Sequence, residues 1–560
     1  MQIAIAQLNY HIGNITQNTA KIIQTIQRAK QDKVDLVVFA EMSVCGYLPM
    51  DLLEFDDFID ASIHAVHTIA PYCTDIAAIV GAPSRNTENT GKKLFNSAYF
   101  LENGTIKQVY NKGLLPNYDV FDEYRYFEPA TTFLPIQYKD KIIALTICED
   151  IWDIQPQPMY DLDPLTQLAT HNPDFIINIS ASPYAATHAW DRKNILNHQT
   201  TKHNVPIVYV NYLGTATEVL FEGSSIIVNK EGNIVLELDV WKEDYRIIDI
   251  NTIQQAKNTT WNADFYKELA IQSKPKNNYD ALVFGVQEYF RKMNFKKAIL
   301  GLSGGIDSAV TAVIAVKALG AENVLAVLMP SSYSSEHSLQ DALQLAKNIN
   351  CSHKIIPIKD MYQSFSDNLL PHFEGIPFNV TEENLQARIR GTTLMALSNK
   401  LGYILLNTTN KSEAAVGYGT LYGDLCGGLA VLADVYKTEI YDLVHYINKD
   451  TEIIPQTIIS KPPSAELRPN QKDSDSLPEY AVLDKIIYEF VERKQSLKQI
   501  ISSQSIDNEI VNFVLKLIKN SEYKRYQTAP AIRISSKAFG IGRRMPLDAL
   551  YDGVTTNYEK

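Results

Sequence analysis

Three residues in the first half of the chain have side chains that together could perform acyl transfer. Glu41 follows the apolar run LVVFA, Lys112 follows IKQVYN, and Cys148 ends IIALTIC. Acyl transfer needs a thiolate nucleophile, a base that takes the thiol proton, and a positive charge that stabilises the thiolate and the oxyanion. Because each residue stands at the end of an expected strand, one edge of a sheet could gather all three.

Taken one at a time, these residues have simpler interpretations. A cysteine that ends an apolar strand is usually an inert buried thiol, and single glutamates and lysines usually lie on the surface. The remaining cysteines form no CxxC pair and no cluster at zinc spacing, so we interpret Cys45, Cys73, Cys351 and Cys426 as structural. This cysteine usage favours a reducing cytoplasm over a disulfide-rich secreted class.

A second group of candidate residues is a short loop that leaves an apolar strand and opens a helix, Gly301-Leu302-Ser303-Gly304-Gly305-Ile306-Asp307-Ser308. Its backbone N–H groups lie at a helix N-terminus, where the macrodipole favours an anion. The glycines allow a phosphate to approach closely, the Ser303 and Ser308 hydroxyls can donate to it, and Asp307 can hold magnesium. The loop lacks the lysine of a Walker A motif. A helix cap with a tight turn is the simpler interpretation of Ser-Gly-Gly alone.

Further polar residues follow this loop. Asn384 and Arg388 lie four apart on one helical face, which could meet either a ligand or solvent. Thr408 and Glu413 come after the strand GYILLN, at the carboxyl end of a parallel strand. Ligands of doubly wound sheets bind at that edge.

The elements that carry the first group are short β-rich runs such as MQIAIAQL, VDLVVFAE and PDFIINIS. Polar turns at Glu102–Gly104 and Asn229–Asn233 predict hairpins. Helical spacing of apolar residues predicts helices over Ile15–Lys30 and Asp191–His203. Together these patterns indicate a sheet sandwich covered by helices.

The second half alternates strand and helix, with helices expected over Ser308–Leu319, Ser338–Asn348 and Asn384–Lys400. Such alternation predicts a parallel, doubly wound α/β sheet. The polar segment between the two halves lacks a long apolar run and suits a connection that ends in a Pro-containing turn. We therefore expect three parts, with ranges 1–252 for the first domain, 253–278 for the linker and 279–560 for the second domain.

Length and composition fit this organisation. The chain has 560 residues, of which 45% are hydrophobic and 21% charged, which is typical of a globular protein with two to four domains. Its formal net charge of −12 argues against long-range attraction of nucleic acid. No apolar stretch is long enough to span a bilayer, and no basic, apolar leader begins the chain. We expect neither nucleic acid nor a membrane as a partner.

Three segments of the first half, FAEMSVCGY, YNKGLLPNYDVFDEYRYF and ICEDIW, resemble in this order the signatures of the nitrilase superfamily. They are most similar to its glutamine-hydrolysing members. The resemblance implies an αββα sandwich in which Cys148 is the nucleophile, Glu41 the proton acceptor and Lys112 the cation beside the intermediate.

The same resemblance implies three contacts for glutamine. Tyr118 and Ser182 match a glutamine-binding tyrosine and serine. Six residues beyond Ser182 the family often has lysine or arginine, whereas this sequence has His188. Whether His188 replaces that basic contact stays open.

In the second half, SGGIDS resembles the pyrophosphate-binding loop of the ATP pyrophosphatase family, which activates a substrate oxygen as its adenylate. The segments ENLQARIRG, NTTNKSE, GYGTLYGDLCGG, DVYKTEIYDL, PPSAELRPNQKDSDSLP and EYKR resemble NAD synthetases. The chain is thus identified as a member of the glutamine-dependent NAD synthetases. This implies a Rossmann-like doubly wound sheet, and amidation of deamido-NAD that consumes ATP and uses ammonia from glutamine.

Residue roles in the second half also come from this resemblance. It implies that ATP is bound by the loop from Gly301 to Ser308, by Thr408 and by Lys437. It implies that deamido-NAD is bound by Asn384, Glu413 and Lys524, and that magnesium is held by Asp307 and Glu413. Glu413 has two candidate roles that the sequence does not separate. Family likeness also suggests a homo-oligomer.

Other amidotransferase and non-enzymatic functions fit the sequence less well. The asparagine-forming amidotransferases use a cysteine directly after the initiator Met, whereas residue 2 is Gln, and the GMP-forming class has a Cys–His–Glu glutaminase. A tRNA-modifying enzyme would be expected to show a basic face or a CxxC pair. An amidase with a regulatory nucleotide-binding domain is a weaker alternative, and a non-enzymatic sensor would not need the intact reactive residues.

Overall fold

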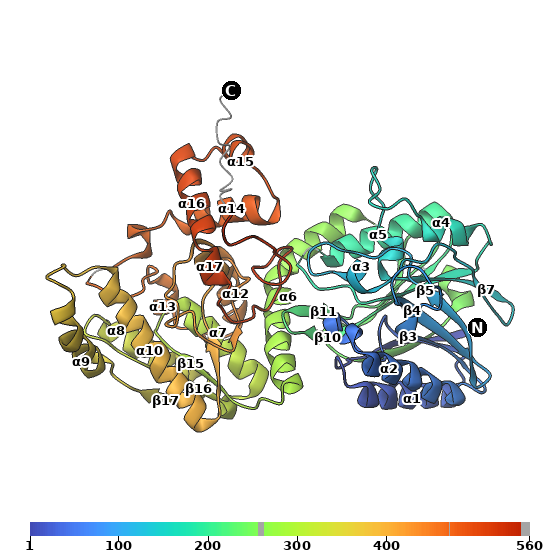
Figure 1. Cartoon of the computed structure of the whole chain (residues 1–560), viewed down its shortest axis with the longest axis horizontal. Helices are drawn as coiled ribbons and strands as arrows, with labels where there is room; N and C mark the ends of the chain where they lie inside the picture. Colours follow the sequence, from blue (N-terminus) through green and yellow to red (C-terminus); the bar gives the residue numbers. More distant parts are fainter. Residues whose placement is uncertain (187, 256–261, 470, 550–560) are drawn as a thin grey trace. The chain divides into compact units, whose positions relative to one another are not determined.

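The computed structural model describes residues 1–186, 188–255, 262–469 and 471–549. The chain divides into two compact units, Met1–Gln272 and Ser273–Lys560 (Figure 1). The predicted domain and linker ranges stay predictions. None of the helices in the described part of the chain combines the length and apolarity that a bilayer span requires.

The first unit is built on two six-stranded sheets. The first sheet has the order β14-β1-β2-β3-β4-β5, with the strands β1 Gln2–Gln7, β2 Leu36–Val38, β3 Ala77–Arg85, β4 Leu94–Glu102, β5 Thr105–Asn111 and β14 Asp244–Asp249. The second has the order β13-β12-β9-β8-β7-β6, with the strands β6 Ile136–Tyr138, β7 Lys141–Ile147, β8 Phe175–Ser180, β9 Ile207–Asn211, β12 Ile226–Val228 and β13 Ile234–Glu237. A separate hairpin pairs β10 Leu213–Ala216 with β11 Val219–Glu222.

Successive side chains along each strand point to opposite faces of the sheet, so one set packs between the two sheets and the other packs under the helices. Ile3 and Ile5 of β1 pack between the sheets with residues of β7, β8 and β9, whereas Ala4 and Ala6 pack under the helices. The helices α1 (Ile15–Gln31) and α2 (Asp56–Ile69) cover the first sheet. The helices α4 (Pro164–Ala169) and α5 (His188–His203) cover the second. The layers are therefore αββα, as expected.

Local predictions for this unit agree with the structure. The turn at Glu102–Gly104 joins the antiparallel strands β4 and β5, and the turn at Asn229–Asn233 joins β12 and β13. The short helix α3 (Glu123–Tyr126) was not predicted.

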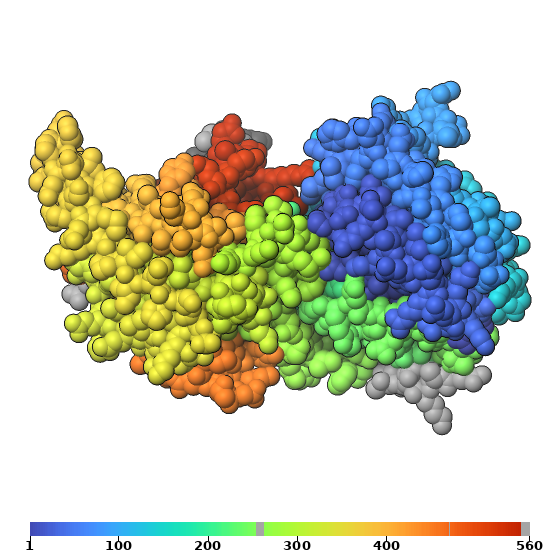
Figure 2. All heavy atoms as spheres, turned by 90° about the horizontal axis from the view of Figure 1, so that it is seen from below, coloured from blue at the N-terminus to red at the C-terminus, as the bar shows by residue number. Residues whose placement is uncertain are grey.

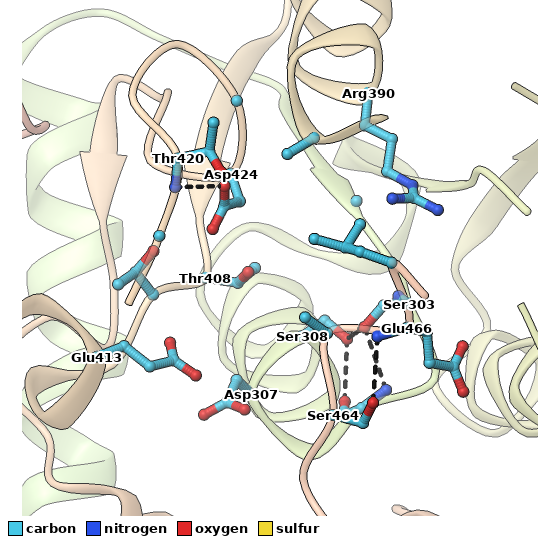
Figure 3. Close-up of a pocket in the computed structure, with 18 of the residues that line it drawn as sticks. Ser303, Asp307, Ser308, Arg390, Thr408, Glu413, Thr420, Asp424, Ser464 and Glu466 are labelled. Carbon is cyan, nitrogen blue, oxygen red and sulfur yellow. Dashed lines mark hydrogen bonds between the residues drawn. The ribbon is translucent and has the colours of Figure 1, made fainter. Parts of the chain in front are cut away.

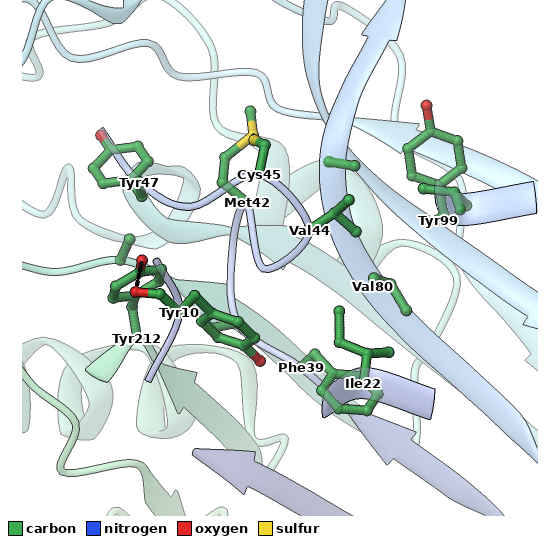
Figure 4. Packing of buried hydrophobic residues seen from close by; sticks show 14 of the residues in the cluster. Tyr10, Ile22, Phe39, Met42, Val44, Cys45, Tyr47, Val80, Tyr99 and Tyr212 are labelled. Carbon is green, nitrogen blue, oxygen red and sulfur yellow. Dashed lines mark hydrogen bonds between the residues drawn. The ribbon is translucent and has the colours of Figure 1, made fainter. Parts of the chain in front are cut away.

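The cysteine interpretation is illustrated by Cys45, which is fully buried among apolar and aromatic side chains that include Tyr10, Phe39 and Tyr47 (Figure 4). Burial raises the pKa of its thiol to about 12. Such a thiol is unreactive at neutral pH, which supports a structural role.

The second unit contains one parallel sheet of five strands in the order β17-β16-β15-β18-β19. The strands are β15 Ala298–Gly301, β16 Val324–Leu328, β17 Ser352–Ile355, β18 Ile404–Asn407 and β19 Leu429–Ala430. The chain winds outward from β15 to β17 and then returns to the other side at β18. Winding therefore reverses between β15 and β18, which is where doubly wound sheets bind ligands.

Helices of the second unit surround this sheet and extend beyond it (Figure 1). Among them, α7 (Ile306–Leu319) packs on β15 and β16, and α10 (Val380–Leu401) packs on β15 and β18. A helical cluster formed by α11, α14, α15 and α16 has its own apolar core. The described helices are α6 Ala263–Lys292, α7 Ile306–Leu319, α8 Glu336–Asn348, α9 Lys359–Leu369, α10 Val380–Leu401, α11 Lys411–Val416, α12 Lys437–Ile447, α13 Gln456–Ser460, α14 Tyr480–Ile487, α15 Leu497–Gln504, α16 Asn508–Asn520 and α17 Glu522–Arg525.

Two features of this unit differ from simple expectation. The Pro-containing turn at the end of the predicted linker is wrong, because Pro275 lies inside the long helix α6. The helix α9 contains no buried residue, and Figure 2 shows the yellow segment around it standing out from the surface.

Candidate active sites

A buried charge cluster lies where two strands of the first unit, β2 and β5, end. Lys112 follows β5, and its Nζ lies 2.8 Å from Oε1 of Glu41, which follows β2. The same Nζ lies 2.8 Å from Oε1 of Glu123, the first residue of α3. The exposed fractions of these side chains are 0% for Lys112 and Glu41 and 3% for Glu123. Burial alone would lower the pKa of Lys112, but Glu123 and Glu41 together raise it, so the ammonium stays charged.

Both carboxylate oxygens of Glu41 are held in place. Asn96 Nδ2 donates to Oε1 at 2.7 Å, and the backbone N–H of Ala181 donates to Oε2 at 2.9 Å. The turn that carries Glu41 lies tightly against β3, since a Cβ on Gly81 would come within 2.4 Å of the Met42 nitrogen. Glycine at this position therefore lets the base sit deep in the sheet edge.

Cys148 stands at a sharp turn directly after β7. Its φ of +44° lies in the left-handed region, which is uncommon for a residue other than glycine and is enriched at functional sites. Desolvation and the charge of Glu41 raise the pKa of its thiol, whereas Lys112 lowers it. Both predicted companions thus act on the thiol. At rest the sulfur carries its proton, so a nearby base is needed to activate it.

Asp150 joins the turn of the cysteine to the turn of the lysine. Its Oδ2 accepts from the Ile147 N–H at 2.9 Å, and its Oδ1 accepts from Gly113 at 3.0 Å and Leu114 at 2.8 Å. Burial raises its pKa to about 6 although these donors oppose the rise. One carboxylate thereby fixes two catalytic candidates relative to each other.

Tyr118, a predicted glutamine contact, bonds to Glu149, which directly follows the candidate nucleophile Cys148. Its hydroxyl donates to Glu149 Oε1 and Oε2 at 2.9 and 3.0 Å. Tyr160 donates to the same carboxylate at 3.2 Å. Desolvation raises the pKa of Glu149 to about 7. The residue after Cys148 is therefore a buried carboxylate bonded by two phenols, with no cation within ion-pair distance among the described residues.

The other two predicted glutamine contacts have different surroundings. Ser182 is buried, and its Oγ accepts from Arg192 Nη2 at 3.4 Å. Arg192 also pairs with Glu222 at 2.9 Å. His188 begins α5, with its Nδ1 3.1 Å from the Pro183 carbonyl oxygen. Arg192, four residues beyond His188, is thus the basic residue that the structure places against Ser182.

A cavity of about 640 Å³ opens at the carboxyl edge of the second unit's sheet (Figure 3). This volume lies within the usual range of about 300–1,000 Å³ for small-molecule sites. The residues that the family resemblance assigns to ligands in this half line it, apart from Gly304, namely Gly301, Leu302, Ser303, Gly305, Ile306, Asp307, Ser308, Asn384, Thr408, Glu413, Lys437 and Lys524.

The phosphate-loop candidate forms the turn between β15 and α7. Gly305 caps α7, and its N–H donates to Ser303 Oγ at 3.2 Å. Ser303 Oγ and Ser308 Oγ lie 3.1 Å apart. Gly304 has φ +80°, and a Cβ there would meet the Ser338 carbonyl oxygen at 2.3 Å. This glycine therefore allows the loop to lie against the start of α8.

A pair of carboxylates lies beside the loop. Asp307 bonds to the Lys437 ammonium, and Asn410 Nδ2 donates to its other oxygen at 2.9 Å. Desolvation and the charge of Asp307 raise the pKa of Glu413 well above its usual value. Figure 3 shows both carboxylates at the same wall of the cavity. Two hard oxygen ligands that repel each other suit a divalent cation.

The predicted dinucleotide contacts meet the loop that follows α11. Asn384 Oδ1 accepts from Thr420 Oγ1 at 2.7 Å. Lys524 Nζ donates to the carbonyl oxygens of Gly417 and Gly419 at 2.7 and 2.8 Å. These residues come from three distant segments, so the cavity joins them only in the folded chain.

Comparison with known proteins agrees with this two-site architecture. The carbon-nitrogen hydrolase family model matches residues 2–258, and the NAD synthase family model matches residues 278–528. The glutamine-dependent NAD(+) synthetase of Synechocystis sp. is 44% identical over 554 residues, covering 97% of this chain and 98% of that protein. The chain belongs to the family of glutamine-dependent NAD(+) synthetases. The predicted family is confirmed.

Further members of the family agree. The glutamine-dependent NAD(+) synthetase of Acinetobacter baylyi is 40% identical, with 98% of both chains covered. A solved structure of the enzyme from Acinetobacter baumannii, in complex with ADP, is 38% identical with a TM-score of 0.75 and covers 98% of both chains. The predicted α/β fold class, with a nitrilase-like part and an NAD synthetase part, is confirmed.

The structure places several residues in these sites that were not predicted from the sequence. Glu123 and Glu149 lie inside the segments FDEYRYF and ICEDIW, so their acidic character was visible. Arg390 was also missed. The predicted face of α10 carried Arg388, but Arg388 donates to the Leu421 carbonyl oxygen at an exposed site, whereas Arg390 lines the cavity.

Proposed function

We propose that this chain makes NAD from deamido-NAD, ATP and glutamine, and that its two units divide the reaction between them. The observation that carries the proposal is the buried lysine between two carboxylates beside the thiol of Cys148. That arrangement supplies a nucleophile, a base and an oxyanion partner for amide hydrolysis, in a chain that also carries a phosphate-loop cavity.

In the first unit, Glu41 takes the thiol proton as Cys148 attacks the side-chain amide carbon of glutamine. The Lys112 ammonium stabilises the oxyanion, and the proton returns to the departing nitrogen, which leaves as ammonia. Water then hydrolyses the thioester to glutamate. Tyr118 and Ser182 are proposed to hold the substrate. Arg192 or His188 would supply the basic contact.

In the second unit, a carboxylate oxygen of deamido-NAD attacks the α-phosphate of ATP and pyrophosphate leaves. The loop from Gly301 to Ser308 is proposed to hold the phosphates, with Thr408 and Lys437 on the nucleotide side. Asn384 and Lys524 are proposed to position deamido-NAD. Ammonia then displaces AMP and forms the amide.

A magnesium ion is proposed at the pair of carboxylates beside the loop. Asp307 and Glu413 would hold it, because magnesium in nucleotide sites commonly takes one or two carboxylates and the substrate's phosphate oxygens. When bound it neutralises charge on the pyrophosphate leaving group. Cytoplasmic location and homo-oligomeric assembly also stay proposals, based on cysteine usage and on family likeness.

The test compares two nitrogen donors with the Cys148→Ala variant. With ATP, magnesium and deamido-NAD, this variant should lose glutamine-driven NAD synthesis by at least about 100-fold. Synthesis driven by ammonium should stay within about twofold of the parent, because the thiol takes no part in the second unit. Cys73→Ala, which removes another buried thiol, is the matched control and should retain both activities.

Equal loss with both donors would contradict the division of labour. A parent chain that hydrolyses glutamine but forms no AMP from ATP would instead support an amidase with a regulatory nucleotide-binding unit.

A further inference from the structure

Arg390 stands out among the cations that line the cavity of the second unit. Lys437 pairs with Asp307, and Lys461 pairs with Glu466 at 2.7 Å. Lys524 donates to two carbonyl oxygens. By contrast, Arg390 forms no ion pair with any residue that the structure describes, and its Nε donates only to the Met329 carbonyl oxygen, at 3.2 Å.

Two carboxylates, Glu466 and Asp424, act electrostatically on Arg390, and both already accept hydrogen bonds from other groups. Glu466 accepts from Lys461 Nζ and from Ser338 Oγ, both at 2.7 Å. Asp424 accepts from the Thr420 N–H at 2.8 Å. Desolvation lowers the pKa of the Arg390 guanidinium to about 10, and the charges of Glu466 and Asp424 offset this effect only in part. At neutral pH the Arg390 guanidinium is charged, poorly solvated and not paired with a carboxylate of the described residues. Such a group binds an anionic ligand strongly.

The position of Arg390 indicates which of the anionic ligands proposed for this cavity it would contact. Met329, its backbone partner, directly follows β16, and β16 lies beside β15, which leads into the phosphate loop. Asn384, six residues earlier on α10, turns instead toward Thr420. Figure 3 shows Arg390 on the side of the cavity where Ser303 lies, with Glu413 and Thr420 across from it.

We propose that Arg390 binds the phosphate chain of ATP, together with the backbone N–H groups of the loop from Ser303 to Ser308. This inference rests on the proposed function. A guanidinium presents parallel N–H donors that match two phosphate oxygens, which a lysine cannot reproduce. Arg390 thus acts as a nucleotide-binding residue for the adenylation half-reaction, and the dinucleotide is held by other groups.

The experiment measures equilibrium binding of a non-hydrolysable ATP analogue and, separately, of deamido-NAD to the full chain. Arg390→Ala should weaken binding of the analogue by about 10- to 100-fold, the range of a charged hydrogen bond. Arg390→Lys keeps the charge but not the fork, and should weaken it by a smaller factor of about 5 or more. Binding of deamido-NAD should change by less than about twofold in both variants. Lys400→Ala, which removes an exposed charge from the same helix, is the control and should leave ATP binding unchanged.

Three results would overturn the inference: unchanged affinity for the analogue, equal weakening for both ligands, or weakening confined to deamido-NAD, whose diphosphate is the other source of the same chemistry. Retained glutamine hydrolysis and an unchanged thermal transition establish that the variants fold. A parent chain that does not bind the analogue would refute the proposed function itself, whereas a parent that binds it as tightly as Arg390→Ala refutes only this role.

Discussion

Replacing Glu123 by glutamine tests whether the second carboxylate on Lys112 is part of the glutaminase machinery. The wild-type carboxylate lies 2.8 Å from Lys112 Nζ, accepts from the Tyr47 hydroxyl at 2.5 Å and accepts from Asn96 Nδ2 at 3.3 Å. Glutamine removes the charge and keeps only one acceptor oxygen. Its amide nitrogen would face a donor, either the Tyr47 hydroxyl or the Asn96 amide.

The size of the effect follows from burial. Removing one partner of a buried ion pair costs about 3–5 kcal/mol, and the remaining amide oxygen favours the lower end, about 3 kcal/mol in the free energy of unfolding. Glu41 then becomes the sole anion on a full ammonium charge, so it accepts the thiol proton less readily. Loss of general-base efficiency on this scale reduces glutamine-driven synthesis by about 100-fold.

The assay pairs chemical denaturation with NAD synthesis from glutamine and from ammonium. Glutamine-driven synthesis should fall while ammonium-driven synthesis stays within about twofold, because Glu123 belongs to the first unit. Glu54→Gln is the matched control, since its carboxylate is 58% exposed and lies 3.7 Å from Arg125, and it should change neither quantity. A glutamine-driven rate within twofold of the parent would refute the reasoning. Equal loss with both donors would refute it as well.

Two further predictions concern carboxylates beside the other proposed reactive groups. Asp307→Asn should reduce NAD synthesis from both donors by at least about 100-fold, because a neutral amide cannot neutralise Lys437 or hold a divalent cation. Glutamine hydrolysis should continue in this variant. An Asp307→Asn chain that still makes NAD would remove this carboxylate from the adenylation step. For Glu149, burial raises the pKa of the carboxyl group to about 7, compared with about 4.3 in an unfolded chain. The contribution of the protonated Glu149 to the free energy of unfolding is therefore complete below pH ~4 and is lost as pH rises through about 7. Glu149→Gln, which cannot ionise, should therefore gain stability relative to the parent between pH 5 and 8, by up to about 3 kcal/mol, and a pH-independent difference in thermal transitions would contradict the buried carboxylate.

The order of many elements could be predicted from local patterns, and the candidate reactive residues were named from their types and from motifs that resemble known families. The helix α7 begins within two residues of its expected start, and both predicted hairpin turns join antiparallel strands. Such features depend on neighbouring residues, which a sequence displays directly. The prediction for Pro275 was wrong because packing of a long helix outweighed the local preference of proline.

The side of α10 that lines the cavity could not be predicted from the sequence pattern. Helical periodicity indicates which residues share a face, and it placed Asn384 with Arg388. It does not say which stripe of a helix meets a cavity, because that depends on what packs around the helix. In the structure Arg390 lines the cavity, and α10 packs on β15 and β18, the strands between which the winding of the sheet reverses.

From its sequence alone, this protein could be assigned a candidate thiol nucleophile, a candidate phosphate loop and a two-part architecture, because residue types at short spacing and motifs that resemble known families are visible in the sequence. Tertiary structure decided the rest. Lys112 lies between a carboxylate 71 residues before it and another 11 residues after it, and only the order of strands in the sheet brings those three charges into one dry site. Burial then sets their chemistry, since a charge removed from water is governed by the few groups that the fold places around it.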